Sequence, residues 1–245
     1  MATINDINKD KLPSHVAVIM DGNGRWAEKK GNDRIFGHQN GVIAVRETVE
    51  VAAELGIGYL TLYAFSTENW NRPREEIDAL MSLLVLTIQN EIKTLNDNNV
   101  RLKVIGDTDS LPVKVKKRLV NAMEDTSSNT GLNLVLALSY SGRWEIVNAM
   151  RDIATDVKAG TISIDEISCD TFSKYLSTAE IPDPELLIRT SGEYRISNFL
   201  LWQIAYTELY FTDILWPDFR KEHFFDAILA FQKRERRFGK ISAQL

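Results

Sequence analysis

Short apolar segments alternate along this chain with longer segments of helical periodicity, and this alternation constrains the fold more than any other feature. The short segments are almost continuously apolar, as expected for strands of a sheet covered on both faces. They span residues 16–20, 59–65, 101–105, 133–138, 186–189 and 207–211. Strands that alternate with helices form mostly parallel sheets. We therefore expect an α/β fold with a central, mostly parallel six-stranded sheet flanked by helices.

The helical segments carry apolar residues at spacings of three and four. One covers residues 41–55 and ends at Gly56, which supplies a stop. The next follows Pro73, which suits the first turn of a helix, and carries a broad apolar stripe from Ile77 to Leu95. Further helices are expected over residues 143–158 and 222–237.

The length of 245 residues fits one domain, which we expect over residues 15–245 after a flexible N-terminal segment at 1–14. No apolar run is long enough to span a membrane, and we expect a soluble, cytoplasmic protein that can act at a membrane surface. A net charge of −5 gives no reason to expect nucleic acid as a partner. The single Cys169 cannot form an internal disulfide, which fits a reducing compartment.

The segment "VIMDGNGRWA" lies where the first strand ends, at the edge where such sheets bind ligands. Gly22 and Gly24 would let backbone N–H groups approach a phosphate, although a tight turn capped by Asp21 explains them equally well. The segment matches neither standard nucleotide-binding fingerprint. A carboxylate repels a neighbouring phosphate unless a cation lies between them, so we interpret Asp21 as a Mg²⁺ ligand.

Arginines recur in the loops expected at this same edge of the sheet. They are Arg25, Arg34, Arg72, Arg189 and Arg195. Each alone would be an ordinary surface residue, but arginine forks bind phosphate oxygens in bidentate geometry. Together they predict two phosphate-bearing ligands, or one diphosphate with an extended partner.

Other polar residues of the expected loops allow two interpretations. Ser66, Glu68 and Asn69 have the chemistry to position a reacting group, but ordinary turn chemistry before Pro73 also accounts for them. Glu208 is an acid inside an apolar strand and is either a second metal contact or a partnered polar group.

Six stretches of the chain together resemble the cis-prenyltransferase family, and within it the bacterial undecaprenyl diphosphate synthases. They are "HVAVIMDGNGRWA", "GH", "TLYAFSTENWNRP", "RTSGE", "RISNFLLWQIAYTELYF" and "WPDF". The resemblance runs from His15 to Gly239. It implies a Mg²⁺-dependent prenyltransferase that condenses isopentenyl diphosphate onto an allylic diphosphate, commonly farnesyl diphosphate. The implied product is a long-chain cis-polyprenyl diphosphate, undecaprenyl diphosphate for cell-wall lipid carrier synthesis, which is delivered to a membrane.

The resemblance also implies roles for individual positions. Asp21 matches the aspartate that engages Mg²⁺ and assists departure of the diphosphate, Asn69 a proton-handling position, and Glu208 a metal-binding acid. The allylic substrate site is implied at Gly22, Asn23, Gly24, Arg25, Trp26, Arg34 and His38. The second substrate loop is implied at Ser66, Thr67, Glu68, Trp70 and Arg72, and the isopentenyl diphosphate site at Arg189, Arg195, Ile196 and Ser197. Arg237-Phe238-Gly239 resembles an R-x-G element that reaches the active site of a neighbouring subunit, which implies a homodimer.

An apolar prenyl chain gains about 0.8 kcal/mol per buried CH₂ and therefore needs a dry tunnel. The stripe from Ile77 to Leu95 and the strand at 134–138 are the expected walls, and the small Ala64 would leave room beside the allylic site. The chain departs from close relatives at Ser139, Ser141 and Tyr194, where Asn, Gly and a His assigned to metal binding often occur. The departure at Tyr194 leaves its part in metal or diphosphate binding open.

The sequence bears on three functions other than that of a cis-prenyltransferase. A trans-prenyl synthase would carry aspartate-rich DDxxD motifs, and this chain has no two adjacent aspartates. A Mg²⁺-dependent phosphohydrolase fits the phosphate-binding features without any new C–C bond. A non-catalytic subunit of a heteromeric prenyltransferase would typically lack the aspartate and the R-x-G end, both of which are present here.

Overall fold

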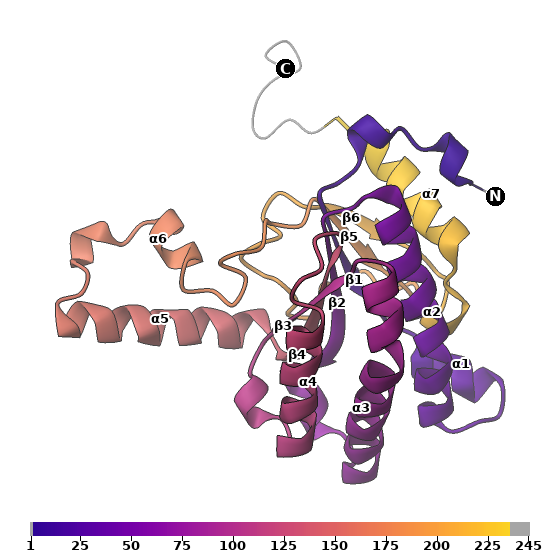
Figure 1. The fold of residues 1–245 in the computed structure, drawn as a ribbon, viewed down its shortest axis with the longest axis horizontal. Coiled ribbons are helices and arrows are strands. Elements are labelled where there is room, and N and C mark those ends of the chain that lie inside the picture. The colour runs from indigo at the N-terminus through magenta and orange to yellow at the C-terminus, as the bar shows by residue number, and fades with distance from the viewer. Residues whose placement is uncertain (1, 236–245) are drawn as a thin grey trace.

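Residues 2–235 are described by the computed structural model, and a six-stranded sheet runs through its centre (Figure 1). The strands are β1 (His15–Ile19), β2 (Tyr59–Ser66), β3 (Arg101–Ile105), β4 (Asn133–Tyr140), β5 (Leu186–Arg189) and β6 (Glu208–Phe211). Their order across the sheet is β3-β4-β2-β1-β5-β6, and every neighbouring pair is parallel. The predicted α/β architecture is confirmed, and all six predicted strands are present.

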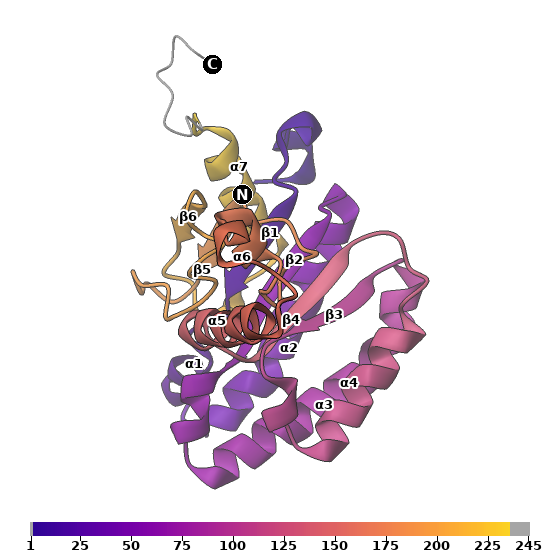
Figure 2. The ribbon, with the colours of Figure 1, turned by 90° about the vertical axis from the view of Figure 1, so that its left-hand side faces the viewer.

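Seven α-helices connect and cover the strands in the described residues. They are α1 (Asn23–Lys29), α2 (Arg34–Leu55), α3 (Arg74–Asp97), α4 (Val113–Asp125), α5 (Gly142–Ala159), α6 (Cys169–Ser173) and α7 (Lys221–Gln232). Helices α2, α3, α4 and α7 cover one face of the sheet, whereas α5 and α6 extend away on the other side (Figures 1 and 2). The second face is covered mainly by the segment that contains Phe199 and Leu200.

Helix α2 begins seven residues earlier than the sequence predicts. The sequence predicts a start at Gly41, but Gly41 and Gly37 lie inside the helix where α1 approaches closely. A Cβ atom on Gly37 would lie 2.0 Å from the carbonyl oxygen of Asn23, and one on Gly41 would lie 2.5 Å from Asn23 Oδ1. These glycines therefore permit close packing of two helices rather than mark a helix end.

The N-terminal segment, which we expected to be flexible, is packed against the domain. Ile7 is buried in the core cluster. Asn8 N–H donates to Gln232 of α7 (3.2 Å), and Gln232 Nε2 donates to the Asn8 carbonyl (2.7 Å). The apolar contact of Ile7 and this pair of hydrogen bonds attach the segment to the domain. The polar composition of the segment gives no sign of these contacts. Among the described helices, none is both long and apolar enough to cross a membrane.

Candidate functional site

The turn after β1 is tied to the turn after β5 at the carboxyl edge of the sheet. Asp21 N–H donates to Thr190 Oγ1 (2.9 Å), and Thr190 Oγ1 donates to the Asp21 carbonyl oxygen (2.6 Å). The two strands are paired in register up to Ile19 and Arg189. Parallel pairing thus brings two loops that are far apart in sequence into one site.

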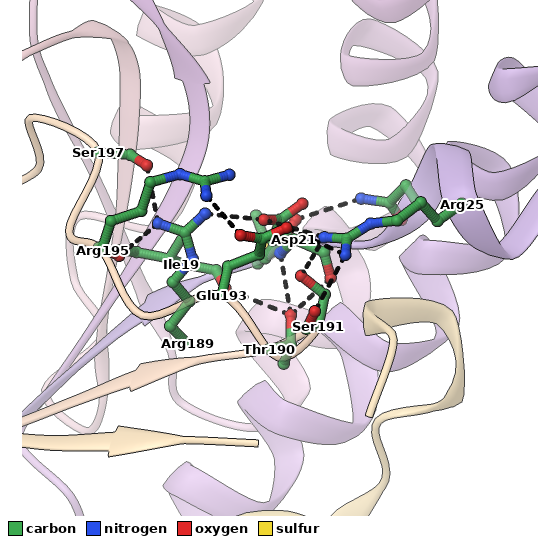
Figure 3. A network of polar contacts seen from close by, with 11 residues as sticks. Ile19, Asp21, Arg25, Arg189, Thr190, Ser191, Glu193, Arg195 and Ser197 are labelled. Atoms are coloured by element: carbon green, nitrogen blue, oxygen red, sulfur yellow. Dashed lines mark hydrogen bonds and ion pairs between the residues drawn. The ribbon is translucent and has the colours of Figure 1, made fainter. Parts of the chain in front are cut away.

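Asp21 lies between two arginines (Figure 3). Arg189 donates to Asp21 Oδ2 (2.8 Å), and the Arg25 guanidinium lies 3.4 Å from the same oxygen. Partial burial by itself would raise the pKa of Asp21, but the hydrogen bond and charge of Arg189, with the charge of Arg25, outweigh it and lower the pKa. The carboxylate is therefore ionised at neutral pH and suited to binding a cation.

Arg189 is the buried charge of the site, with a side chain only 3% exposed. One terminal nitrogen donates to Ser197 Oγ (2.7 Å) and to the Arg195 carbonyl, and the other donates to Asp21 (Figure 3). Its Nε has no hydrogen-bond partner among the described residues. A buried donor without a partner is costly, so this atom is well suited to a ligand oxygen.

A second carboxylate, that of Glu193, pairs with the two more exposed arginines of the site, Arg25 and Arg195. It forms ion pairs with Arg25 (3.2 Å) and with Arg195. Arg25 also donates to Ser191, through the carbonyl (3.1 Å) and Oγ (2.6 Å). Three arginines and two carboxylates thus form one connected network across the β1 and β5 loops (Figure 3).

The backbone at this edge holds an unusual concentration of left-handed residues that are not glycine. Their φ angles are 80° at Ser191, 47° at Ser197, 62° at Asn198, 47° at Leu200 and 47° at Ser139. Each such residue costs about 1–3 kcal/mol, and strained backbone of this kind occurs mostly at functional sites.

Gly22 supplies the sharp turn after Asp21. It caps α1 with φ 109°, and a Cβ atom there would lie 2.9 Å from Leu215 Cδ2. Gly24 has a different reason, since its Cβ would lie 2.8 Å from the guanidinium of Arg34. The two glycines therefore make room for the turn and for an arginine.

The loop after β2 forms the opposite wall of the site. Residues Thr67–Asn71 form a short 3₁₀ helix, in which Ser66 N–H donates to Asn69 Oδ1 (3.1 Å). Glu68 Oε1 accepts a hydrogen bond from Asn198 (2.7 Å), which ties this loop to the β5–β6 segment. This contact joins the loop after β2 to the segment between β5 and β6 at the polar end of the site.

His38 faces this wall from α2. Burial, together with the charges of Arg72 and Arg34, lowers the pKa of His38 to about 4, while the charge of Glu76 acts in the opposite direction. The imidazole is therefore neutral at pH 7. Arg72 and Arg34 both pair with Glu76, at 3.0 Å and 3.6 Å.

A cavity of about 690 Å³ opens from this polar end into the space between the sheet and helices α2 and α3. Its inner wall is apolar and includes Leu80, Leu84 and Leu95 of α3 and Leu134, Leu136 and Leu138 of β4. These are positions expected from the apolar stripe and the fourth strand, and Ala64 also lines the cavity. The volume lies within the range of small-molecule pockets.

The structure brings one group of predicted site residues to the cavity wall. These are Asp21, Asn23, His38, Ser66, Glu68, Asn69, Arg72, Arg189 and Ser197. A second group does not line the cavity: Gly22, Gly24, Arg25, Trp26, Arg34, Thr67, Trp70, Arg195, Ile196 and Glu208. Three residues of this second group form ion pairs at the polar end: Arg25 with Asp21, Arg34 with Glu76 and Arg195 with Glu193.

Two tryptophans predicted to meet substrate have other neighbours. Trp26 donates to Asp218 (2.8 Å) and stacks on Phe36. Trp70 donates to Ser139 Oγ (2.9 Å) and packs edge-on against Phe65. Both rings thus brace loops of the site.

Glu208 lies away from Asp21 within this chain. It faces Leu186 at the amino end of the β5–β6 pair, three residues, or about 10 Å, before Phe211 meets Arg189. Its carboxylate pairs with Arg234 (2.6 Å). The ligands of one metal ion lie within about 2.6 Å of it, so Glu208 and Asp21 of one chain are too far apart to share an ion here.

The other predicted elements are an exposed tyrosine and the C-terminal motif. Tyr194 is 77% exposed and lies against the ring of Phe211. The Arg237-Phe238-Gly239 motif lies outside the described residues.

The side chains at the polar end fit a divalent metal only if a bound molecule supplies further oxygen ligands. No group of three His, Cys, Asp or Glu side chains that could hold a metal occurs in residues 2–235. Mg²⁺ retains waters and commonly uses one or two carboxylates plus phosphate oxygens, and Asp21 alone fits that pattern. The residues therefore suit a metal that arrives with, or is completed by, a diphosphate.

Sequence reasoning missed four contacts at this edge, those of Thr190, Ser191, Glu193 and Asn198. Thr190 and Ser191 lie directly after Arg189 in "RTSGE", so their place beside the arginine was a usable signal. The positive φ angle of Ser191 has no sequence signature, because serine rarely adopts it.

Comparisons with known proteins agree on one family. The family model described as "Putative undecaprenyl diphosphate synthase" matches residues 19–239. The chain is 55% identical over 234 residues to an isoprenyl transferase of Chlorobaculum tepidum, covering 96% of this chain and 88% of that one. It is 52% identical over 234 residues to a ditrans,polycis-undecaprenyl-diphosphate synthase of Pasteurella multocida, named as (2E,6E)-farnesyl-diphosphate specific, covering 96% and 98%.

Solved structures show the same fold. The lavandulyl diphosphate synthase of Lavandula x intermedia, in complex with dimethylallyl diphosphate, superposes with a TM-score of 0.92 at 38% identity, covering 94% of this chain and 100% of that one. A probable undecaprenyl diphosphate synthase of Campylobacter jejuni gives a TM-score of 0.77 at 36% identity, covering 93% and 99%.

Proposed function

The chain belongs to the undecaprenyl diphosphate synthase family of prenyltransferases, and on this basis we propose that it condenses isopentenyl diphosphate onto an allylic diphosphate, with farnesyl diphosphate as primer. The proposed product is a long-chain cis-polyprenyl diphosphate, undecaprenyl diphosphate, for delivery to a membrane. One observation carries the proposal: an arginine- and carboxylate-rich polar end opens directly into a long apolar cavity of about 690 Å³. A diphosphate with a prenyl tail matches both parts at once.

The allylic diphosphate is assigned to the side of the site formed by the start of α1 and α2 and by the loop after β2. Arg34, Arg72 and the neutral His38 face this side, and Asn23 lines the cavity beside them. Loss of the allylic diphosphate leaves a carbocation-like centre and places negative charge on the departing oxygens. Arginine forks positioned beforehand stabilise that charge without reorganisation.

Isopentenyl diphosphate is assigned to the β5–β6 side. Arg189, with its unpartnered buried Nε, and Ser197 line the cavity there, and Arg195 lies next to them. The C–C bond forms between the two sites when the double bond of isopentenyl diphosphate attacks the allylic carbon. A proton then passes from the former isopentenyl unit to the released diphosphate, and we assign Asn69, whose Oδ1 accepts from Ser66 N–H, to positioning that acceptor.

We assign Mg²⁺ as the divalent metal, held by Asp21 together with diphosphate oxygens. When bound, it supplies positive charge to the departing diphosphate. Arg189 and Arg25 hold Asp21 ionised and oriented toward that position. The strand position of Glu208 separates it from Asp21 of the same chain. As a metal contact, Glu208 could therefore serve only the site of a neighbouring subunit.

A homodimer is part of the proposal. Val147 and Met150 of α5 and Ile164 after it are exposed on the arm that extends from the domain (Figure 1). Apolar side chains gathered on a projecting helix are typical of an interface. Light scattering after size-exclusion chromatography would measure the mass directly, and a monomer at working concentration would contradict this part.

The deciding experiment is incubation with labelled isopentenyl diphosphate, farnesyl diphosphate and Mg²⁺, followed by product sizing. We expect chain elongation that chelation of the metal abolishes. A parallel reaction with dimethylallyl diphosphate measures primer preference. Release of inorganic phosphate without label in a longer product would instead identify a phosphohydrolase, and no reaction in the presence of all components would favour a non-catalytic subunit.

A further inference from the structure

Helices α2 and α3 form the outer wall of the cavity and lie next to each other. They follow β1 and β2, which are paired, and both run from the carboxyl edge of the sheet toward the amino edge. Val42 and Val45 of α2 line the cavity, as do Leu80, Leu84 and Ile88 of α3. These apolar side chains form no polar contacts of their own, so any polar contact across the seam comes from other residues of the two helices.

Two ion pairs connect α2 and α3 in the described residues. Arg34 and Glu76 (3.6 Å) lie at the polar end, where the helices begin. Arg46 and Glu91 form the second, with Arg46 Nε 3.3 Å from Glu91 Oε2. Arg46 follows Arg34 by 12 residues, which is about 18 Å along α2.

The second pair is part of the cavity wall. Both Arg46 and Glu91 line the cavity, which continues past them to Ala53 and Leu95. The Arg46 side chain is 52% exposed and that of Glu91 is 16% exposed, so the arginine reaches over the acid from the solvent side. The pair therefore lies at the side of the cavity, over its inner half, and does not form its end.

An exposed ion pair contributes little to stability, so its position matters more than its strength. An apolar chain inside the cavity is retained by exclusion of water, at about 0.8 kcal/mol per CH₂. Water that enters through the seam would remove this gain from the part of the chain beyond Arg46. Separation of the helices at the same place would offer the chain a lateral exit.

We propose that the Arg46–Glu91 pair closes the side of the prenyl cavity between α2 and α3 and determines how long a growing chain is retained. The inference rests on the proposed function, because it takes the occupant to be the prenyl chain of that reaction. Opening of the pair releases the chain laterally, and the length of the product depends on the balance between elongation and this release.

The test reverses each charge singly and then exchanges the two. Arg46→Glu and Glu91→Arg replace attraction by repulsion, whereas the double variant restores an opposite pair. Arg46→Gln is a milder variant in case a reversal disturbs folding. Lys93→Glu is the matched control for a charge reversal on this surface. Lys93 lies on α3, as Glu91 does, forms an exposed pair with Asp97 and does not line the cavity.

Two measurements are made on each variant: transfer of preformed labelled product into phosphatidylcholine vesicles, and the length distribution of products. We expect each single reversal to release product roughly fivefold faster and to shorten the average product. Arg46→Gln should shift both values in the same direction, and the exchanged pair and Lys93→Glu should match wild type. Unchanged release and lengths in the single reversals, or a double variant as altered as the singles, would overturn the inference. A wild-type chain that does not elongate at all would overturn the proposed function instead.

Discussion

Arg189, at the end of β5, donates a 2.8 Å hydrogen bond to the carboxylate of Asp21, which follows the neighbouring strand β1. The arginine is almost fully buried, so each residue depends on the other: the acid neutralises a buried cation, and the cation keeps the acid ionised. Loss of one partner leaves a buried charge without compensation, which is strongly destabilising. This pair therefore links the stability of the site to its chemistry.

Replacement of Asp21 should abolish condensation. Asp21→Asn removes the negative charge but keeps an oxygen that can accept from Arg189, so we expect a fall in turnover of roughly a hundredfold or more with a folded protein. Asp21→Ala also removes the acceptor and should lower the melting temperature further. Steady-state incorporation of isopentenyl diphosphate and thermal unfolding are the measurements, and near-normal elongation by either variant would contradict the role of Asp21.

The two arginines of the isopentenyl diphosphate side should respond differently to truncation. The Arg195 side chain is 60% exposed, so Arg195→Ala should raise the Michaelis constant for isopentenyl diphosphate by roughly tenfold with little change in melting temperature. Arg189→Ala removes a buried side chain with three polar partners and should reduce both activity and stability. Unchanged Michaelis constants for both substrates in Arg195→Ala would count against its assignment.

Binding of an allylic diphosphate should be accompanied by proton uptake at His38. Its pKa of about 4 means that it is neutral in the free protein, and a bound anion favours the charged form and raises the pKa. Between the free and the bound pKa, binding therefore takes up protons. Calorimetric titration with a non-reactive allylic diphosphate analogue at pH 6, in buffers of different ionisation enthalpy, measures this uptake.

His38→Asn is the comparison for that titration, because the diphosphate itself also changes its protonation on binding. We expect the variant to take up fewer protons than wild type at the same pH. Equal uptake by the two proteins would show that His38 stays neutral in the complex.

Gly22→Ala should destabilise the protein through both strain and a clash. The left-handed conformation alone costs about 1–2 kcal/mol for an alanine, and the added methyl would also lie 2.9 Å from Leu215. Gly31→Ala is the matched control, since Gly31 also has a positive φ but no atom within 4 Å of an added Cβ. Chemical denaturation should show a larger loss for Gly22→Ala, and equal losses would mean that Leu215 moves away freely.

Much of the fold could be predicted because its signals are local. Strand β5, at Leu186–Arg189, is a short apolar run with no competing interpretation, and the stripe of α3 has a clear helical period. The start of α2 was missed because Gly37 and Gly41 serve a contact with α1, and contacts between helices have no local signature. Helix α4 was missed altogether, although Val115, Leu119 and Ala122 are its buried face.

The site was predictable to the extent that parallel strands bring their following loops to one edge. That rule places Asp21, Arg72 and Arg189 together. It does not tell which way each side chain turns: Trp26 and Trp70, which match substrate positions of the family, donate to Asp218 and Ser139 and do not line the cavity. Glu208 was predicted to be a second metal contact or a partnered polar group, and the register places it at the amino end of its strand, where it pairs with Arg234.

The network around Asp21 carries its own counter-ions. Asp21 and Glu193 offset two of the three positive charges of Arg25, Arg189 and Arg195 before any ligand arrives. A diphosphate with several negative charges therefore meets a site of small net charge, and a divalent cation meets the same site with one carboxylate to offer. Each ligand supplies the charge that the other lacks, so cation and diphosphate must raise one another's affinity by the same factor. Under the proposed function, we therefore expect the site to bind the metal–diphosphate pair cooperatively and each component more weakly alone.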